Sequence, residues 1–238
     1  MVVSGRAGPR DASAAPGGPS RRTPPAFVEL YEEIADCPRC ELARTRSHTV
    51  PGAGPAPAEV MCIGEAPGQR EDELGLPFVG ASGRFLDQLL AVAGLARDTV
   101  YIANVVKCRP PDNRDPALEE IAACAPFLDR QIAAVDPRVI VTLGRFSMAR
   151  WFPGEAISRI HGRAKRADGR LIVPMYHPAA ALRNGGLRPV IEADFAQLPQ
   201  LLEHARAGAA TSAPAAITHA APPAAPTTST TPAGERLL

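Results

Sequence analysis

Four short apolar runs, separated by stretches with helical periodicity, constrain the fold of this chain more than any other feature. Each run has the length of a buried strand and ends where glycine, proline or a polar residue begins. We expect strands at residues 60–63, 100–106, 139–143 and 171–177. Strands that alternate with helices are typical of an open sheet covered on both faces. The predicted fold class is therefore α/β, a three-layer α/β/α architecture around a central, mostly parallel four-stranded sheet.

The stretches between the runs show the spacing of apolar residues that is typical of helices. Ser82 is the expected N-cap of one helix. Pro126 should bend or divide another, because proline lacks the amide donor that a helix interior needs. We expect helices at residues 27–34, 82–93 and 117–135, after Gly144, and at 190–205.

Both ends of the chain lack the large apolar side chains that could offset the entropy of ordering. We expect one domain at residues 24–206, between disordered tails at residues 1–23 and 207–238. There is no apolar run of about 18 residues, and no apolar segment follows the N-terminal arginines. We therefore expect a cytoplasmic protein with no membrane partner. The net charge of +1 neither requires nor excludes a nucleic-acid partner.

Four of the five cysteines are arranged as metal ligands. Cys37 and Cys40 form a close pair, and Cys108 and Cys124 flank a proline-rich loop. Four thiolates from two distant segments suit a zinc ion or an iron-sulfur cluster, although the wide second spacing makes zinc less natural. Unligated cysteines are the third possibility. Cys62 lies inside an apolar run, where a thiol packs as a small hydrophobe, so we exclude it from the metal site.

Polar and aromatic residues follow the predicted strands, where ligands bind in open α/β sheets. Glu65 lies in a glycine-bounded loop and could position a water molecule or stabilise a cation. Phe78 lies in a second glycine-bounded loop with little core to join, and it could stack on a base. Asn104 offers a donor and an acceptor, and His177 precedes a proline that holds its backbone extended. The alternatives are a solvated turn for Glu65 and structural roles for the other three.

Together these motifs resemble those of the family 4 uracil-DNA glycosylases in order and surroundings. The resemblance extends over roughly residues 30–202. The matching segments are GEAPGQRED at residues 64–72, PFVGASG at 77–83, NVVKCRPPDNR at 104–114 and HPAAALR at 177–183.

The resemblance implies a DNA repair enzyme that excises uracil from DNA by hydrolysing the N-glycosidic bond. Such a monofunctional glycosylase flips the base out of the stack and leaves an abasic site and free uracil, as in base excision repair. It also implies a structural [4Fe-4S] cluster, a monomeric protein and the three-layer fold of the superfamily. The implied cluster ligands are Cys37, Cys40, Cys108 and Cys124.

The resemblance also assigns roles in the uracil site. Phe78 would stack on uracil, and the Asn104 amide would donate to O4 and accept from N3–H. His177 would donate to O2 of the leaving base, while Glu65 would hold the attacking water and stabilise the cationic sugar. The adjacent Gly64 and Ala66 would complete the uracil-binding loop. Glu71 would exclude the methyl group of thymine.

Five residues are the expected DNA contacts. Leu182 would be the wedge that fills the vacated stack, next to Arg183. Arg109, Arg114 and Lys165 would contact phosphates and make binding depend on salt.

His161 raises the question of a related branch that forms a covalent adduct with DNA through a histidine in an R-R-I-H-like insertion. The chain has Arg159-Ile160-His161, but in a different place along the sequence. We therefore expect His161 to be a surface or DNA-contacting residue, and ordinary turnover. Two further hypotheses are a non-catalytic nucleic-acid-binding protein and a zinc-stabilised enzyme that acts on a free nucleoside.

Overall fold

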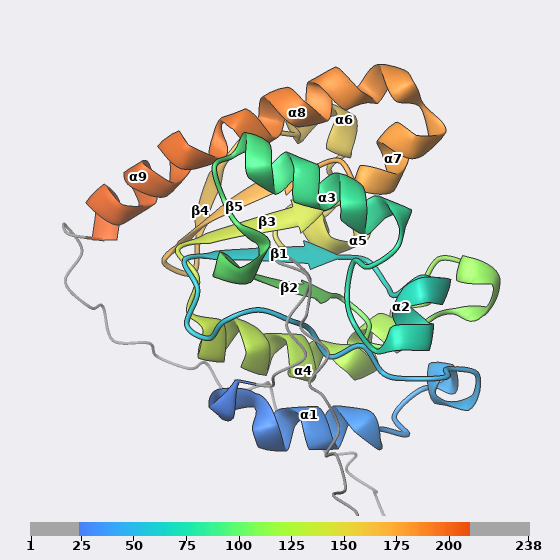
Figure 1. Cartoon of the computed structure of the whole chain (residues 1–238). Coiled ribbons are helices and arrows are strands. Elements are labelled where there is room, and N and C mark those ends of the chain that lie inside the picture. The colour runs from blue at the N-terminus through green and yellow to red at the C-terminus, as the bar shows by residue number, and fades with distance from the viewer. Residues whose placement is uncertain (1–23, 210–238) are drawn as a thin grey trace, which may run out of the picture.

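The computed structural model describes residues 24–209, which form a three-layer α/β/α fold (Figure 1). The central sheet has the strand order β2-β1-β3-β5-β4, in which the first four strands are parallel and β4 is antiparallel to β5. The strands are β1 (Val60–Gly64), β2 (Val100–Asn104), β3 (Val139–Leu143), β4 (Lys165–Ala167) and β5 (Arg170–Met175). The predicted α/β class and the mostly parallel sheet are confirmed.

The prediction of four strands was wrong, because a fifth strand, β4, pairs with β5 at the edge of the sheet. This strand is short and mostly exposed, so it has no apolar run to mark it. Asp168 and Gly169 join β4 to β5, and both have positive φ angles, as in the turns of two-residue hairpins. The Asp-Gly pair was therefore the signal in the sequence that could have predicted this strand.

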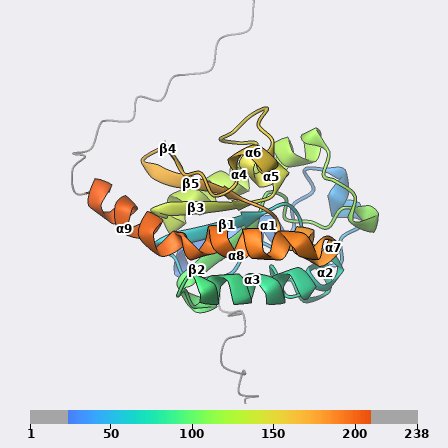
Figure 2. The same cartoon turned by 90° about the horizontal axis from the view of Figure 1, so that it is seen from above.

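Helices cover both faces of the sheet. Helices α1 and α4 pack on one face, while α3 and α8 run side by side over the other (Figures 1 and 2). The helices are α1 (Val28–Ala35), α2 (Gln69–Leu74), α3 (Ala81–Val92), α4 (Leu118–Val135), α5 (Arg145–Met148), α6 (Ile157–Ile160), α7 (Pro178–Arg183), α8 (Arg188–Ala196) and α9 (Leu198–Ala209).

Two details of the predicted helices were wrong. Helix α3 begins at Ala81 with Gly80 as its N-cap, so Ser82 lies inside the first turn. Helix α4 continues through Pro126 as one element, so the proline does not divide it. The predicted last helix is instead two helices, α8 and α9, because Pro199 at the start of α9 has no amide hydrogen to continue the bonding of α8.

Alternate residues of the buried strands point into two separate cores. In β1, Cys62 packs with the core under α3 and α8, whereas Met61 and Ile63 pack with the core under α1 and α4.

The expected domain of residues 24–206 stays a prediction, and it lies within residues 24–209, which the structure describes. Helix α9 continues to Ala209, past the expected boundary. The predicted tails at 1–23 and, from residue 210 on, at the C-terminus lie outside the described residues. Among the helices of residues 24–209, none combines the length and the apolar composition that a membrane span requires.

Candidate active site

A cavity of about 330 Å³ lies at the carboxyl ends of β1, β2 and β5. It has walls from the loop after β1, the loop before α3, the loop after β2 and the start of α7. Four residues that the sequence singled out, from four separate segments of the chain, share this cavity. They are Glu65, Phe78, Asn104 and His177.

Glu65 follows the last residue of β1 and is partly buried at the cavity wall. Burial raises the pKa of its carboxyl above the usual value, and the nearby Asp115 carboxylate raises it further. Arg145 and Arg183 act in the opposite direction. Glu65 is thus a partly desolvated carboxyl within the field of two guanidinium groups.

Gly64 lets three parts of the site approach one another. A Cβ atom at this position would lie 2.7 Å from Cζ of Phe78 and would also collide with Oδ1 of Asn104. Gly64 therefore allows the ring and the amide to meet beside Glu65. Ala66 lies next to them in the cavity wall.

Phe78 is held in a backbone conformation that non-glycine residues rarely adopt, with φ +52°. The carboxylate of Glu71 in α2 accepts hydrogen bonds from the backbone N–H groups of Val79 and Gly80, both at 2.8 Å. Two fixed hydrogen bonds thus hold the segment that follows Phe78. The expectation that Phe78 has little core to join was wrong, since its ring is only 5% exposed and packs against the core while facing the cavity.

Asn104 ends β2 and is only 1% exposed. Its Oδ1 is buried and has no hydrogen-bond partner among the residues that the structure describes. Its backbone carbonyl accepts a hydrogen bond of 2.7 Å from the ammonium of the buried Lys107, which also donates to Gln131 at 2.6 Å. The backbone of Asn104 is therefore fixed while its side-chain acceptor remains available at the cavity.

His177 is the N-cap of α7, and its ring faces the cavity. The backbone N–H of Ala179 donates to Nδ1 at 3.1 Å, so in the neutral ring the hydrogen is on Nε2. Burial lowers the pKa of His177 to about 4, and Arg183 contributes to this shift. His177 therefore presents a neutral Nε2–H donor near neutral pH.

The expected DNA contacts do not all lie at the cavity. Arg183 lines the cavity. Leu182, the residue before it on α7, has an exposed apolar side chain. The ammonium of Lys165 instead donates to the Trp151 carbonyl at 3.2 Å and lies over the Phe152 ring, away from the cavity lining.

The sequence did not single out part of the cavity wall that comes from the loop after Cys108. Pro110 and Asn113 line the cavity together with Arg114. Arg109 donates from Nε to Oδ1 of Asn113 at 2.8 Å. The proximity of this loop to the GEAPG loop depends on the path of residues 108–117, which no local pattern reveals.

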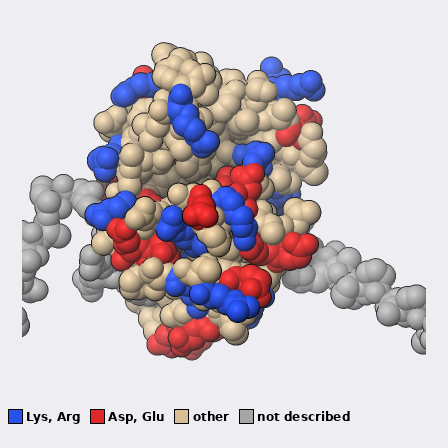
Figure 3. All heavy atoms as spheres, turned by 90° about the vertical axis from the view of Figure 1, so that its right-hand side faces the viewer, with Lys and Arg blue, Asp and Glu red and all other residues tan. Residues whose placement is uncertain are grey.

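The face at the carboxyl ends of the strands carries charges of both signs (Figure 3). Lys and Arg side chains lie among Asp and Glu side chains there. The ion pair of Arg145 with Asp115 is one example. His161 also has an acidic partner, because its Nδ1 lies 2.8 Å from Oδ2 of Asp194, and it does not line the cavity.

The four cysteines that the sequence predicted as metal ligands lie around a second, smaller pocket between α1, α4 and the loop after β2. Cys37, Cys40, Cys108 and Cys124 all line it. Arg46 donates to the backbone carbonyl of Cys37 at 2.8 Å and to Sγ of Cys108 at 3.3 Å.

The charged side chains around this second pocket and the placement of possible metal ligands describe it further. Arg39, Arg46 and Lys107 line it, and among the described residues around it none is a carboxylate. Within residues 24–209, no three His, Cys, Asp or Glu side chains are placed to hold one metal ion. Cys62 lies elsewhere, fully buried in β1, where burial raises the pKa of its thiol to about 12.

The fold and the cavity define a member of the uracil DNA glycosylase superfamily, whose family model matches residues 51–198. The curated relatives are more specific. The type-4 uracil-DNA glycosylase of Sulfurisphaera tokodaii is 48% identical over 186 residues, which are 74% of this chain and 84% of that protein. The type-4 uracil-DNA glycosylase of Archaeoglobus fulgidus is 43% identical and is covered over 92% of its length, compared with 73% of this chain. The type-4 uracil-DNA glycosylase of Thermotoga maritima is 41% identical over a region that covers 65% of this chain and 82% of that protein.

This chain belongs to the type-4 uracil-DNA glycosylases. The family that the sequence motifs indicated is therefore confirmed.

Proposed function

We infer that this chain removes uracil from DNA by hydrolysing the N-glycosidic bond, which releases free uracil and leaves an abasic site. Its family membership makes it a DNA repair hydrolase of this class. The observation that carries the inference is the convergence of Glu65, Phe78, Asn104 and His177 on one cavity. Because the target bond is inaccessible inside a duplex, the nucleotide must be flipped into this cavity.

Asn104 reads the Watson–Crick edge of uracil. Its buried Oδ1 accepts from N3–H, and its amide group donates to O4. Cytosine reverses both the donor and the acceptor, so it would leave buried polar groups unpaired. The 1% exposure of Asn104 makes this penalty large. Phe78 contributes by stacking on the ring.

His177 and Glu65 stabilise the charges that develop as the bond breaks. The leaving uracil becomes an anion, and the neutral Nε2–H of His177 donates to its O2. The sugar becomes cation-like, and the Glu65 carboxylate stabilises it and holds the attacking water. Gly64 and Ala66 form the loop that brings Glu65 to the base.

Glu71 excludes thymine from this site. Its carboxylate lines the cavity, and two backbone hydrogen bonds fix the position of Oε1. A fixed carboxylate does not give way to the methyl group on C5 of thymine. Glu71 therefore excludes thymine by shape and holds Phe78 in place.

DNA contacts surround the cavity. Leu182 is 54% exposed at the end of α7 and is the wedge that fills the gap left by the flipped base. Arg183 follows it at the cavity wall, and Arg109 and Lys165, which do not line the cavity, are phosphate contacts farther out. These contacts make DNA binding weaken with salt.

The second pocket holds a [4Fe-4S] cluster on Cys37, Cys40, Cys108 and Cys124. Four thiols around one pocket are the donor set of such a cluster, and the three cationic side chains around them match its negative charge. The cluster supplies structural cross-linking, because it joins the segment after α1 to the loop that borders the uracil cavity. Arg46 fixes one thiolate ligand and the backbone of another.

The remaining features of the proposal concern the whole protein. We propose that residues 24–206 form the catalytic domain, that the chain acts as a monomer, and that it works in the cytoplasm.

A single-turnover assay on a uracil-containing oligonucleotide tests the function. The expected result is free uracil and an abasic site, with no product from the same oligonucleotide that carries cytosine. Visible absorption of the anaerobically purified protein separates an iron-sulfur cluster from zinc. Folded, cluster-loaded protein that releases no uracil would favour a docking role in nucleic-acid binding.

A further inference from the structure

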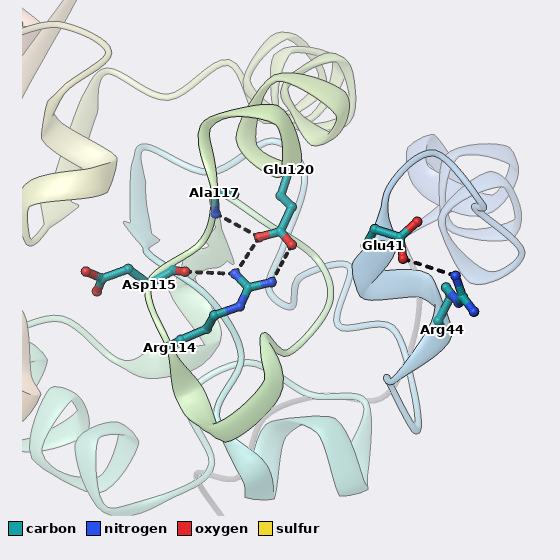
Figure 4. A network of polar contacts seen from close by, with 6 residues as sticks. All are labelled: Glu41, Arg44, Arg114, Asp115, Ala117 and Glu120. Atoms are coloured by element: carbon teal, nitrogen blue, oxygen red, sulfur yellow. Dashed lines mark hydrogen bonds and ion pairs between the residues drawn. The ribbon is translucent and has the colours of Figure 1, made fainter.

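The segment between Cys108 and Cys124 contains a bidentate ion pair that joins the loop after β2 to the start of α4 (Figure 4). Arg114 donates from Nη1 to Oε2 of Glu120 at 2.9 Å and from Nη2 to Oε1 at 2.6 Å. The backbone N–H of Ala117 donates to the same carboxylate at 2.7 Å. The Glu120 side chain is 6% exposed and that of Arg114 is 45% exposed. Two parallel hydrogen bonds between the guanidinium and the carboxylate fix the relative orientation of the two side chains, in addition to pairing their charges.

The pair joins two sites of the molecule. Glu120 lies in the first turn of α4, one turn before Cys124 on the same side of the helix. Arg114 lies at the wall of the uracil cavity, next to Asn113. The pair is therefore a direct connection from the helix that carries a cysteine of the second pocket to the cavity wall.

The cavity wall at this point needs such support. Asp112 and Asn113 both have φ +53°, a left-handed conformation that non-glycine residues adopt only where their surroundings hold them. Arg109, next to Cys108, holds Asn113 from one side. Glu120 holds Arg114 from the other side.

These bonds also limit what Arg114 can do for DNA. Three of the five N–H donors of Arg114 are already used, two by Glu120 and one by the carbonyl of Asp115. A phosphate that displaced Glu120 from the guanidinium would leave the buried carboxylate, among the described residues, with the N–H of Ala117 as its donor. Leaving a buried charge with too few partners is costly.

We propose that Arg114 and Glu120 form a clamp that positions the cavity wall at Asn113 and Arg114 against the flipped nucleotide, and that Arg114 is not a phosphate contact. Both are positioning residues for the glycosylase reaction, so this inference rests on the proposed function. The two residues affect the rate of the reaction because they position the wall of the cavity. They do not change the affinity of the protein for DNA.

The experiment compares Arg114→Lys, Glu120→Gln and the double variant with the wild-type protein. Arg114→Lys keeps the positive charge but loses the bidentate fork, and Glu120→Gln keeps an acceptor for Ala117, so the start of α4 is preserved. Arg44→Gln is the matched control, because Arg44 and Glu41 form an ion pair whose side chains are 78% and 79% exposed (Figure 4). The measurements are the single-turnover rate at saturating DNA, and binding to uracil-free DNA at several salt concentrations.

The clamp predicts that each single variant lowers the rate about tenfold, and that the double variant is no slower than the slower single variant. Binding to uracil-free DNA and its salt dependence should stay as in the wild type, as should the visible absorption. Arg44→Gln should match the wild type throughout.

A different pattern would overturn the clamp. A normal rate in Arg114→Lys, or additive losses in the double variant, would show that the two residues act separately. As a second check, Arg114→Gln would reduce the slope of log affinity against log salt by about one if Arg114 contacted a phosphate. Wild-type protein that releases no uracil would instead refute the proposed function, whatever the variants do.

Discussion

The ring of Phe78 lies beside that of His177, with centroids 5.6 Å apart and planes 28° from parallel. A base stacked between two rings needs about 7 Å, since each stacked contact takes about 3.5 Å. The space between the two rings is therefore too narrow for a base. In the proposed function, uracil would stack on the cavity side of Phe78 and have His177 at its edge.

The pH dependence of turnover should follow Glu65 before His177. Burial raises the pKa of Glu65 above its ordinary value of 4.5, whereas burial lowers that of His177 to about 4. On acidification, Glu65 therefore takes up a proton first, and the site loses the negative charge that stabilises the sugar. We expect a level rate around neutral pH and a fall as the pH approaches the raised pKa of Glu65, before His177 takes up a proton. Glu65→Gln should lower the rate about 10²- to 10³-fold, and its remaining activity should fall only near pH 4.

The same substitution has an opposite effect on stability. Because the folded pKa of Glu65 is raised, ionisation of this side chain destabilises the folded state at neutral pH. Glu65→Gln should therefore raise the thermal midpoint at about pH 7, and the gain should vanish below the unfolded pKa of about 4.5. A midpoint that is lower than that of the wild type at neutral pH would contradict the assigned burial effect.

Gly64→Ala should damage the site without unfolding the protein. The added Cβ would lie 2.7 Å from Phe78 and would meet the acceptor of Asn104, so both base-reading groups must move. We expect uracil release to slow by at least tenfold, measured in single turnover, with the far-ultraviolet circular dichroism unchanged. Gly185→Ala is the control, because a Cβ there meets nothing within 4 Å. Equal rates for the two variants would show that the close approach at Gly64 does not matter.

The sequence predicted those residues of the site whose positions are set by the end of a strand. Glu65 and Asn104 each follow a buried apolar run, and parallel strands bring such ends to one edge of the sheet. The contribution of Asn113 could not be predicted, because the loop reaches the cavity through two consecutive left-handed residues and a side-chain hydrogen bond from Arg109, which no pattern of residue types marks. The burial of Phe78 was missed for a similar reason. Its ring joins the core only because α3 packs against its backbone, at Gly83.

Substitution of the cysteines should separate the proposed ligands from the core thiol. Cys124 lines the pocket that the other three proposed ligands share, whereas Cys62 is fully buried in the core under α3 and α8. Cys124→Ala should abolish the visible absorption of the anaerobically purified protein, and Cys62→Ala should retain it. The reverse result would assign the wrong set of ligands. Iron and sulfide analysis of both variants gives an independent measure.

Glu71 gives the strictest test of specificity, because its carboxylate lines the cavity and also holds the segment after Phe78. Glu71→Gln keeps an acceptor oxygen of the same size, so uracil release should slow only a few fold and thymine should still be refused. Glu71→Ala leaves the N–H groups of Val79 and Gly80 without that acceptor and opens space next to C5 of the base. We expect it to slow uracil release by about tenfold or more and to raise the ratio of thymine to uracil release, measured on matched oligonucleotides with a G·T or a G·U pair. If Glu71→Ala slows both reactions equally, the carboxylate only positions Phe78, and the exclusion of thymine must come from another part of the cavity.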